Sequence, residues 1–206
     1  MATQAPLVYL ASRSPRRQEL LRQIGLRFEE LRLREAPGRA PDVVEGARDA
    51  EPPLHYVERL ARTKASVGWQ QMQRRVLPPH PVLGADTEVA LDGAIFGKPQ
   101  DPAEAVRMLA RLSGRTHQVF SAVAIRWNDD VGVEVSQSEV TLRTLDTVEI
   151  ERYVATGEPF DKAGGYAIQG RAGAFVAHIS GSYSGVMGLP LYETAALLTR
   201  IGFPVL

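Results

Sequence analysis

The chain has 206 residues, with 24 basic and 24 acidic side chains and no cysteine. This length suits a single domain, here residues 1–206, with a substantial core. Balanced charge gives no overall attraction to nucleic acid or to an anionic membrane, so any positive field must be local. The lack of cysteine excludes disulfides, thiolate catalysis and cysteine-ligated zinc. Because no signal-peptide pattern or long apolar run is present, we expect a cytoplasmic protein outside the membrane.

An apolar run from Leu7 to Ala11 predicts a short buried strand. A helix start follows at Ser14 and Pro15, because a serine oxygen can accept an unpaired N–H and proline fits the first helical position. Gly25 is placed to end this helix.

Arg16 and Arg17 are unusual in a first helical turn, where the helix dipole favours anions. Together with the hydroxyls of Ser12 and Ser14, they indicate a site for phosphate oxygens. The alternative is that both arginines point into solvent and that the serines are ordinary helix caps.

The stretch from Leu26 to Leu33 predicts a second strand, and a Pro-, Gly- and charge-rich stretch up to Pro53 predicts a surface loop. Glu45 in this loop faces either a site or water. Helical spacing of apolar residues then predicts a helix over 54–72. Lys64 lies on its apolar stripe, where a lysine either extends along the edge to solvent or reaches a phosphate.

The segment 81–91 begins as a buried strand and then places Asp86 and Thr87 right after its small residues. In α/β proteins the carboxyl end of such a strand is where ligands bind. A tight hairpin turn follows at 92–93. Lys98 does not belong to a phosphate-binding P-loop, because the spacing is one residue short and Pro99 replaces the hydroxyl needed for magnesium. Lys98 therefore stands as an isolated candidate phosphate contact.

The rest of the chain alternates irregularly between helices and strands, which is typical of a mixed α/β sheet flanked by helices. The stretch 158–170 is rich in glycine, and glycines permit close approach of the backbone to a ligand. The predicted elements are a helix from Asp101 to Gly114, a strand hairpin over 116–127 and 131–142, a helix over 147–155, a strand over 174–179, a turn over 180–185 and a helix over 191–201.

Separate stretches thus offer matching chemistry. Hydroxyls, arginines and lysines, including Lys162, can bind a polyphosphate, while Asp86 and Glu45 can hold a divalent metal such as Mg²⁺ or Mn²⁺. The amide of Gln169 can donate and accept hydrogen bonds and so recognise a polar ligand. The four histidines share no ligand spacing and are interpreted as structural. The residues alone therefore favour metal-assisted hydrolysis of a phosphoanhydride.

The order of motifs resembles the Maf family of nucleoside triphosphate pyrophosphatases over nearly the whole chain. The motifs that carry this resemblance are Ser-x-Ser-Pro-Arg-Arg-x-Glu-Leu-Leu at 12–21, Arg-Leu-Ala-x-x-Lys-Ala at 59–65, Gly-Ala-Asp-Thr at 84–87, Lys-Pro at 98–99, Leu-Ser-Gly-x-Thr-His-x-Val at 112–119, Asp-Lys-Ala-Gly-x-Tyr-x-Ile-Gln-Gly at 161–170 and Gly-Leu-Pro-Leu at 188–191.

The resemblance implies a two-lobed fold with a central cleft, similar to that of the inosine triphosphatases. It implies hydrolysis between the α- and β-phosphates of a nucleoside triphosphate, which contributes to nucleotide-pool sanitation. Asp86 matches the family's proton acceptor and Glu45 an acidic position. Lys64 and Lys98 match the family's site lysines.

Within the family, a dTTP/UTP branch and a 7-methyl-GTP branch differ at three positions. The residues here, Arg16, Thr87 and Gln169, are those of the dTTP/UTP branch. Gln169 can donate and accept toward a pyrimidine imide edge, whereas a glutamate suits a methylated, positively charged guanine. The resemblance therefore implies a preference for dTTP and UTP.

Two departures from the family pattern stand out. Arg13 stands where the family usually has a small or short polar residue, and it either adds charge at the phosphates or points away from them. The loop at 34–40 is also longer than usual in the family. The expected partner is the nucleotide substrate, with a homodimer as one candidate assembly and without nucleic acid or membrane. A non-catalytic nucleotide or nucleic-acid binder that regulates septum formation is the alternative function.

Overall fold

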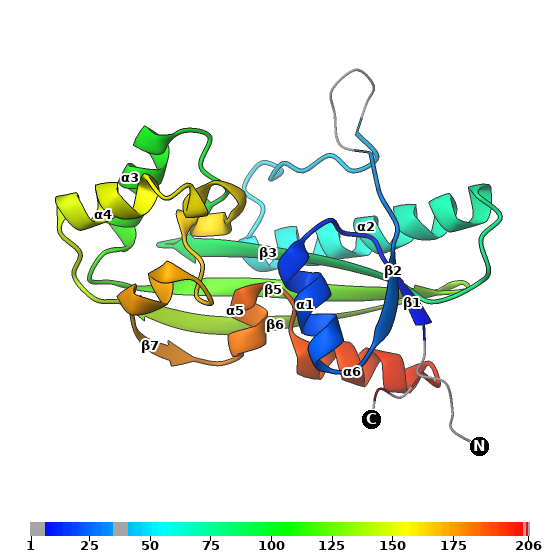
Figure 1. Cartoon of the computed structure of the whole chain (residues 1–206). Helices are drawn as coiled ribbons and strands as arrows, with labels where there is room; N and C mark the ends of the chain where they lie inside the picture. The colour runs from blue at the N-terminus through cyan, green and yellow to red at the C-terminus, as the bar shows by residue number, and fades with distance from the viewer. Residues whose placement is uncertain (1–6, 35–40, 204, 206) are drawn as a thin grey trace.

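One mixed sheet of seven strands runs through the molecule (Figure 1). The structure, a computed structural model, describes residues 7–34, 41–203 and 205. The sheet order is β2-β1-β3-β5-β6-β7, and β4 pairs with β3 beside this path. The strands are β1 (Leu7–Leu10), β2 (Arg27–Glu30), β3 (Val82–Leu91), β4 (Ala94–Phe96), β5 (Thr116–Trp127), β6 (Asp130–Leu142) and β7 (Val176–Ser180).

Strand β1 runs parallel to β2 and β3, whereas every other strand pair is antiparallel. The mixed α/β class predicted from the sequence is therefore confirmed. The turn between β3 and β4 has positive φ at Asp92 (52°) and Gly93 (78°), as a two-residue hairpin requires.

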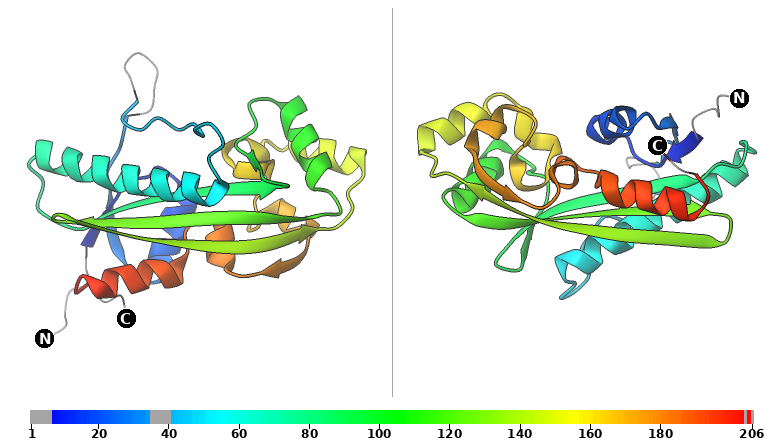
Figure 2. Two further views of the ribbon diagram at one scale, coloured as in Figure 1. Left: turned by 180° about the vertical axis from the view of Figure 1, so that it is seen from behind. Right: turned by 90° about the horizontal axis from the view of Figure 1, so that it is seen from below.

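Helices flank the sheet on both faces and gather at one end of it (Figures 1 and 2). The long α2 packs on one face, and α1 and α6 pack on the other. The helices are α1 (Pro15–Gln23), α2 (Pro53–Arg74), α3 (Pro102–Leu112), α4 (Thr147–Val154), α5 (Tyr183–Met187) and α6 (Leu191–Arg200), with 3₁₀ helices η1 (Glu158–Asp161), η2 (Ala163–Gly165) and η3 (Arg171–Phe175).

Two lobes are defined by their hydrophobic cores. One core joins α1 and α6 to β1, β3 and β5, and the other joins α3 and α4 to the far ends of β3, β5 and β6. Ile168 packs against both cores and marks where the lobes meet. The predicted two-lobed arrangement is confirmed.

Alternation along β3 decides which side chains reach which face. Leu83 and Ala85 belong to the core with α1 and α6, and Val89 continues on that face into the other lobe. Gly84 lies on the opposite face, against α2. Because side chains alternate with a period of two, Asp86 and Glu88 share the α2 face with Gly84.

Three details differ from the sequence predictions. Strand β2 ends at Glu30, well before Leu33, although Leu31 still donates its N–H to Leu10. The predicted turn at 180–185 contains the start of α5, whose cap is the Ser182 hydroxyl. Ser14 occupies the cap position of α1 but makes no capping hydrogen bond with its side chain.

The unusual loop length at 34–40 concerns residues that, apart from Arg34, lie outside the described ones. Within residues 7–34, 41–203 and 205, no helix combines the length and the apolarity that crossing a membrane requires.

Candidate active site

A gap in strand pairing creates the site. On one edge of β3, β1 pairs as far as Leu83 and β4 begins to pair at Val89, while the other edge pairs with β5 throughout. The segment 84–88 therefore has one edge without a neighbouring strand. Asp86, at the middle of this open edge, is in a position that a ligand can reach.

A cleft of about 540 Å³ lies over this open edge, between the two lobes. Each candidate site residue predicted from the sequence lines this cleft. They come from β1 and α1, the 41–52 loop, α2, β3, the segment after β4, and the segment around η2: Ser12, Ser14, Arg16, Arg17, Glu45, Lys64, Asp86, Thr87, Lys98, Lys162 and Gln169.

Lys64 is the cation at the centre of the cleft. Its Nζ lies 2.6 Å from Oδ1 of Asp86 and 2.6 Å from Oε1 of Glu45. The side chains of Lys64 and Asp86 are only 12% and 9% exposed, whereas that of Glu45 is 48% exposed. A buried charge requires a partner of opposite sign, and this cluster supplies one to each member.

Close packing of α2 on β3 brings Lys64 to Asp86. A Cβ on Gly84 would lie 2.5 Å from the backbone oxygen of Ala61 and against the N–H of Ala65. Only glycine therefore allows α2 to approach the strand this closely. The Gly-Ala-Asp-Thr motif thus contains both the glycine that lets α2 approach and the carboxylate of Asp86 that Lys64 reaches as a result.

The electrostatics of Glu45 reflect its neighbours. Burial raises the pKa of Glu45, but the charge and hydrogen bond of Lys64 outweigh this effect, with help from Lys98 and Arg17. The net result is a pKa below the usual value of a glutamate. Of the two readings for Glu45, site or water, the structure places it at the cleft.

Glu88 is a cleft residue that the sequence analysis missed. Burial, and then repulsion by Asp86, raise the pKa of Glu88 to about 8, against the attraction of Lys98 and Lys64. Its Oε2 is buried without a hydrogen-bond partner in the described structure. The signal available in the sequence was the spacing of two from Asp86 along a strand, which places both carboxyl groups on one face.

A second group of contacts surrounds the carbonyl oxygen of Gly188. Arg17 donates its Nε–H to this oxygen at 2.9 Å, and Thr87 donates its hydroxyl at 3.3 Å. Arg17 also donates to the Ser12 hydroxyl at 3.1 Å, and Thr87 pairs with Ser121 at 2.8 Å. Burial lowers the pKa of Arg17, against the attraction of Asp86. Gly188 and Ser121 were not singled out from the sequence, although Gly188 begins the Gly-Leu-Pro-Leu motif.

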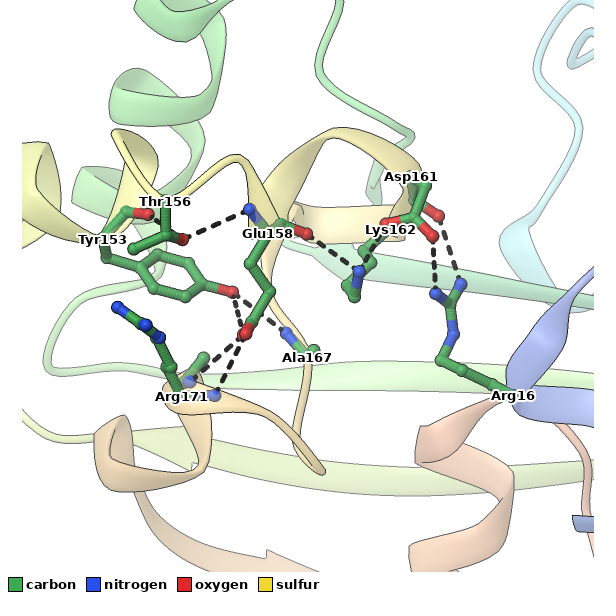
Figure 3. Close-up of polar contacts among 9 residues, drawn as sticks. Arg16, Tyr153, Thr156, Glu158, Asp161, Lys162, Ala167 and Arg171 are labelled. Carbon is green, nitrogen blue, oxygen red and sulfur yellow. Dashed lines mark hydrogen bonds and ion pairs between the residues drawn. The ribbon is translucent and has the colours of Figure 1, made fainter. Parts of the chain in front are cut away.

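Arg16 and Lys162 come from different lobes and meet at Asp161 (Figure 3). Arg16 donates to Oδ2 of Asp161 at 2.9 Å and to its backbone oxygen at 3.1 Å. Lys162 pairs with Oδ1 of the same carboxylate and donates to the backbone oxygen of Glu158 at 2.8 Å. The anion beside the first turn of α1 is therefore a side chain of the protein, and Lys162 forms an ion pair with the same side chain.

Other predicted residues differ in how they are held. Within the described structure, Lys98 and Gln169 line the cleft without a hydrogen bond or ion pair of their side chains. Arg13 also lines the cleft and donates to the backbone oxygen of Leu33 at 3.3 Å. Lys98 is thus the candidate phosphate contact whose charge is the most available to a ligand.

The carboxyl groups fit a divalent metal that is shared with substrate. Oδ2 of Asp86 is buried and has no hydrogen-bond partner in the described structure, and the carboxylate of Glu45 meets Asp86 at the Lys64 ammonium. Among the described residues, no three His, Asp or Glu side chains form a complete metal cage. Mg²⁺ is commonly held by one or two carboxylates together with phosphate oxygens. The donor set therefore suits a metal that binds with a nucleotide.

Known proteins with a similar sequence are named for nucleotide chemistry. This chain is 55% identical over 199 residues to the dTTP/UTP pyrophosphatase of Aromatoleum aromaticum, covering 96% of this chain and 97% of that one. It is 56% identical over 191 residues to the protein of the same name from Nitrosospira multiformis, covering 93% and 92%. A third dTTP/UTP pyrophosphatase, from Chromobacterium violaceum, is 50% identical over 98% of both chains.

A solved structure of the Staphylococcus aureus Ham1 protein is a distant match, with 12% identity, a TM-score of 0.45 and coverage of 95% of this chain and 97% of that one. The profile of the family described as Maf-like protein matches residues 7–201, which include every residue that lines the cleft. With a full-length match of this kind and relatives at half identity or more, the chain belongs to the Maf family.

Proposed function

We propose that the cleft hydrolyses dTTP and UTP between the α- and β-phosphates and releases the nucleoside monophosphate and pyrophosphate. The observation that carries this proposal is a cleft in which the five cations Arg16, Arg17, Lys64, Lys98 and Lys162 gather with a partly unpaired aspartate at an open strand edge. The names of the relatives, at 50–56% identity, support the substrate class.

The triphosphate tail replaces contacts that the protein makes with itself. Guanidinium and ammonium groups bind phosphate oxygens through charge-assisted hydrogen bonds. Arg17 retains donors beyond those used for Gly188 and Ser12, because a guanidinium carries five N–H groups. The side chain of Lys98 has no hydrogen bond or ion pair to give up within the described structure, so it makes the first contact with the incoming phosphates. Ser12 and Ser14 add hydroxyl donors at the same helix terminus.

Asp86 acts as the proton acceptor. Its Oδ1 is held by Lys64, while its Oδ2 has no partner in the described structure and accepts a proton from water. The water oxygen forms a bond to the α-phosphorus, the bond from that phosphorus to the bridging oxygen breaks, and pyrophosphate leaves. General base catalysis of this kind typically contributes 10²–10⁴-fold, and the cations stabilise the charge on the leaving group.

Asp86 and Glu45 are the residues that would hold a divalent metal ion when a nucleotide is bound. Such an ion would neutralise phosphate charge and polarise the phosphoryl group. Lys64 contacts both carboxylates in this structure and orients Asp86 through Oδ1.

Arg16, Thr87 and Gln169 set the preference for pyrimidines. The Gln169 amide both donates and accepts hydrogen bonds, which matches the imide edge of thymine or uracil. A site that offers those hydrogen bonds favours a base that completes them over a base that leaves them unpaired. Gln169 has no hydrogen-bond partner in the described structure, so its amide is available to the base.

A nucleotide panel with and without a divalent cation tests the proposal. Purified protein is incubated with dTTP, UTP, dCTP, dATP, dGTP and 7-methyl-GTP, and both products are quantified. We expect monophosphate and pyrophosphate in equal amounts, fastest for dTTP and UTP, with activity lost in chelator. Faster cleavage of 7-methyl-GTP contradicts the branch assignment, and release of inorganic phosphate alone contradicts the reaction.

The non-catalytic alternative, a regulator of septum formation, is not favoured by the relatives, which are named as enzymes. The homodimer and the cytoplasmic location stay predictions. Sedimentation of the purified protein and fractionation of the host cell test them.

A further inference from the structure

Glu158 lies at the base of the segment that carries Lys162 and Gln169 (Figure 3). One carboxylate oxygen accepts the hydroxyl of Tyr153 at 2.9 Å and the N–H of Ala172 at 3.4 Å. The other accepts the N–H of Arg171 at 3.2 Å. A single carboxylate therefore joins α4 to the first turn of η3, immediately after Gln169.

The Tyr153 hydroxyl extends this connection to the other side of Gln169. It accepts the N–H of Ala167 at 3.3 Å while it donates to Glu158 (Figure 3). The backbone is thus fixed at Ala167, before the glutamine, and at Arg171, after it. Only Ile168, Gln169 and Gly170 lie between the two fixed points.

Gly170 shows how closely the carboxylate packs against this segment. A Cβ at this position would lie 2.6 Å from Oε1 of Glu158. The space that a side chain would fill is already taken by the glutamate. The carboxylate therefore fixes the segment by contact as well as by hydrogen bonds.

The backbone oxygen of Glu158 makes a further contact, with Lys162 at the beginning of the segment. It accepts the ammonium of Lys162 at 2.8 Å, and Lys162 shares the carboxylate of Asp161 with Arg16 (Figure 3). Glu158 is thus connected both to a phosphate-binding lysine and to the glutamine that faces the base.

Neither Glu158 nor Tyr153 is among the residues that line the cleft. In this structure both side chains are set back from the cleft, so we expect their effect on substrate to pass through other residues. A glutamate with purely structural importance would change stability without changing which nucleotide is preferred. The two roles are therefore separable by experiment.

We propose that Glu158, together with the Tyr153 hydroxyl, is a positioning unit that sets nucleotide selectivity by fixing the backbone on both sides of Gln169. The inference rests on the proposed pyrimidine preference of the cleft. Catalysis itself depends on Asp86 and Lys64, which lie on β3 and α2 and do not contact this unit.

Three variants test the unit: Glu158→Gln, Tyr153→Phe and the double variant. Glutamine replaces one acceptor oxygen with an N–H₂ donor, so at least one of the three hydrogen bonds is lost whichever way the amide lies. Tyr153→Phe removes the bridge to Ala167 and keeps the ring. Glu149→Gln is the control, because Glu149 lies on the same helix α4 as Tyr153, does not line the cleft, and pairs with Arg143, which precedes the helix.

Binding of dTTP and dGTP is measured by calorimetric titration without divalent metal, and kcat and KM for dTTP are measured alongside. The selectivity is the dissociation constant of dGTP divided by that of dTTP. We expect this ratio to fall roughly tenfold in Glu158→Gln, as when one charged hydrogen bond no longer orients a side chain. KM rises while kcat stays within about threefold. Tyr153→Phe shifts the ratio in the same direction, and the double variant adds little, because both act through one connection.

An unchanged ratio in both single variants overturns the inference, as does a loss of kcat with KM and selectivity intact. The same shift in Glu149→Gln also overturns it, since the effect would then be general destabilisation. A wild-type protein that binds dTTP no better than dGTP overturns the pyrimidine preference itself and the inference with it. If Glu158→Gln does not fold, the milder Tyr153→Phe decides between these outcomes.

Discussion

The ammonium of Lys64 lies 2.6 Å from a carboxylate oxygen of Asp86, and this contact joins the long helix α2 to the open edge of β3. It leaves the second oxygen of Asp86 without a partner in the described structure. One oxygen is thus bound by the protein, and the other is buried and keeps its acceptor capacity. In the reaction that we propose, this second oxygen is the one that accepts a proton from water.

Replacing Asp86 with asparagine should abolish pyrophosphate release while the protein stays folded. The amide cannot accept a proton from water, so we expect kcat for dTTP to fall by about 10²–10⁴-fold. Asp92→Asn is the control, because Asp92 follows the same strand and pairs with Arg115 at an exposed turn. Near-normal turnover of Asp86→Asn, with a melting temperature equal to that of the wild type, would remove Asp86 from the catalytic role.

Loss of Arg16 should weaken triphosphate binding. Arg16→Ala removes a charged hydrogen-bond donor at the mouth of the cleft and leaves the Asp161 carboxylate with one cation fewer. We expect a loss of roughly 1.5–3 kcal/mol, or about 10- to 150-fold in Kd for dTTP by titration. Arg22→Ala, on the same helix but over the ring of Phe28, should leave Kd unchanged. Equal affinity in both variants contradicts a role for Arg16.

Gly84→Ala should separate α2 from β3. The added Cβ would collide with the backbone of Ala61 and Ala65, and overpacking of this kind costs about 1–3 kcal/mol. Because the same displacement moves Lys64 from Asp86, kcat should fall together with stability. Gly97→Ala, whose Cβ would meet nothing within 4 Å, should change the free energy of unfolding by less than about 0.5 kcal/mol. Denaturant titration of the two variants measures the difference.

His117 should make folding stability depend on pH in the acidic range. Burial lowers its pKa from 6.5 to about 4, and its Nε2 lies 2.7 Å from the hydroxyl of Tyr166. Between these pH values the unfolded chain binds a proton that the folded protein does not, so stability is lost as the pH falls from 6.5 toward 4. The difference corresponds to about 3 kcal/mol.

Denaturant titrations at several pH values in this window provide the measurement. His117→Gln should flatten the dependence, whereas His55→Gln, an exposed histidine on α2, should keep it. A His117→Gln variant with the same slope as the wild type would show that other groups account for the loss.

Local patterns predicted the elements whose signals are confined to a few neighbouring residues. Asp101 caps α3 by accepting the N–H of Glu104, as the spacing indicated. The turn residues Asp92 and Gly93 likewise produced the expected hairpin. By contrast, the five-residue helix α5 has too few residues for a periodic signal and was predicted as a turn.

The site illustrates the same limit. The residues and the family resemblance gave the candidate side chains that line the cleft, apart from Glu88, but not the contacts between them. Arg16 was recognised as requiring an anion, yet its partner Asp161 is 145 residues away along the chain. Glu88 was overlooked because its importance comes from burial beside Asp86, which depends on the packing of α2. The spacing of two from Asp86 predicts a shared face of the strand, but the burial of that face is set by tertiary contacts that the sequence pattern does not show.

The position of water attack tests the account most directly. Hydrolysis of dTTP is carried out in H₂¹⁸O, and the products are analysed by mass spectrometry. We predict that the label enters only the phosphate of dTMP, because the base at Asp86 directs water to the innermost phosphorus. Label found in the pyrophosphate, or in inorganic phosphate, would contradict the assignment of the reaction and of Asp86.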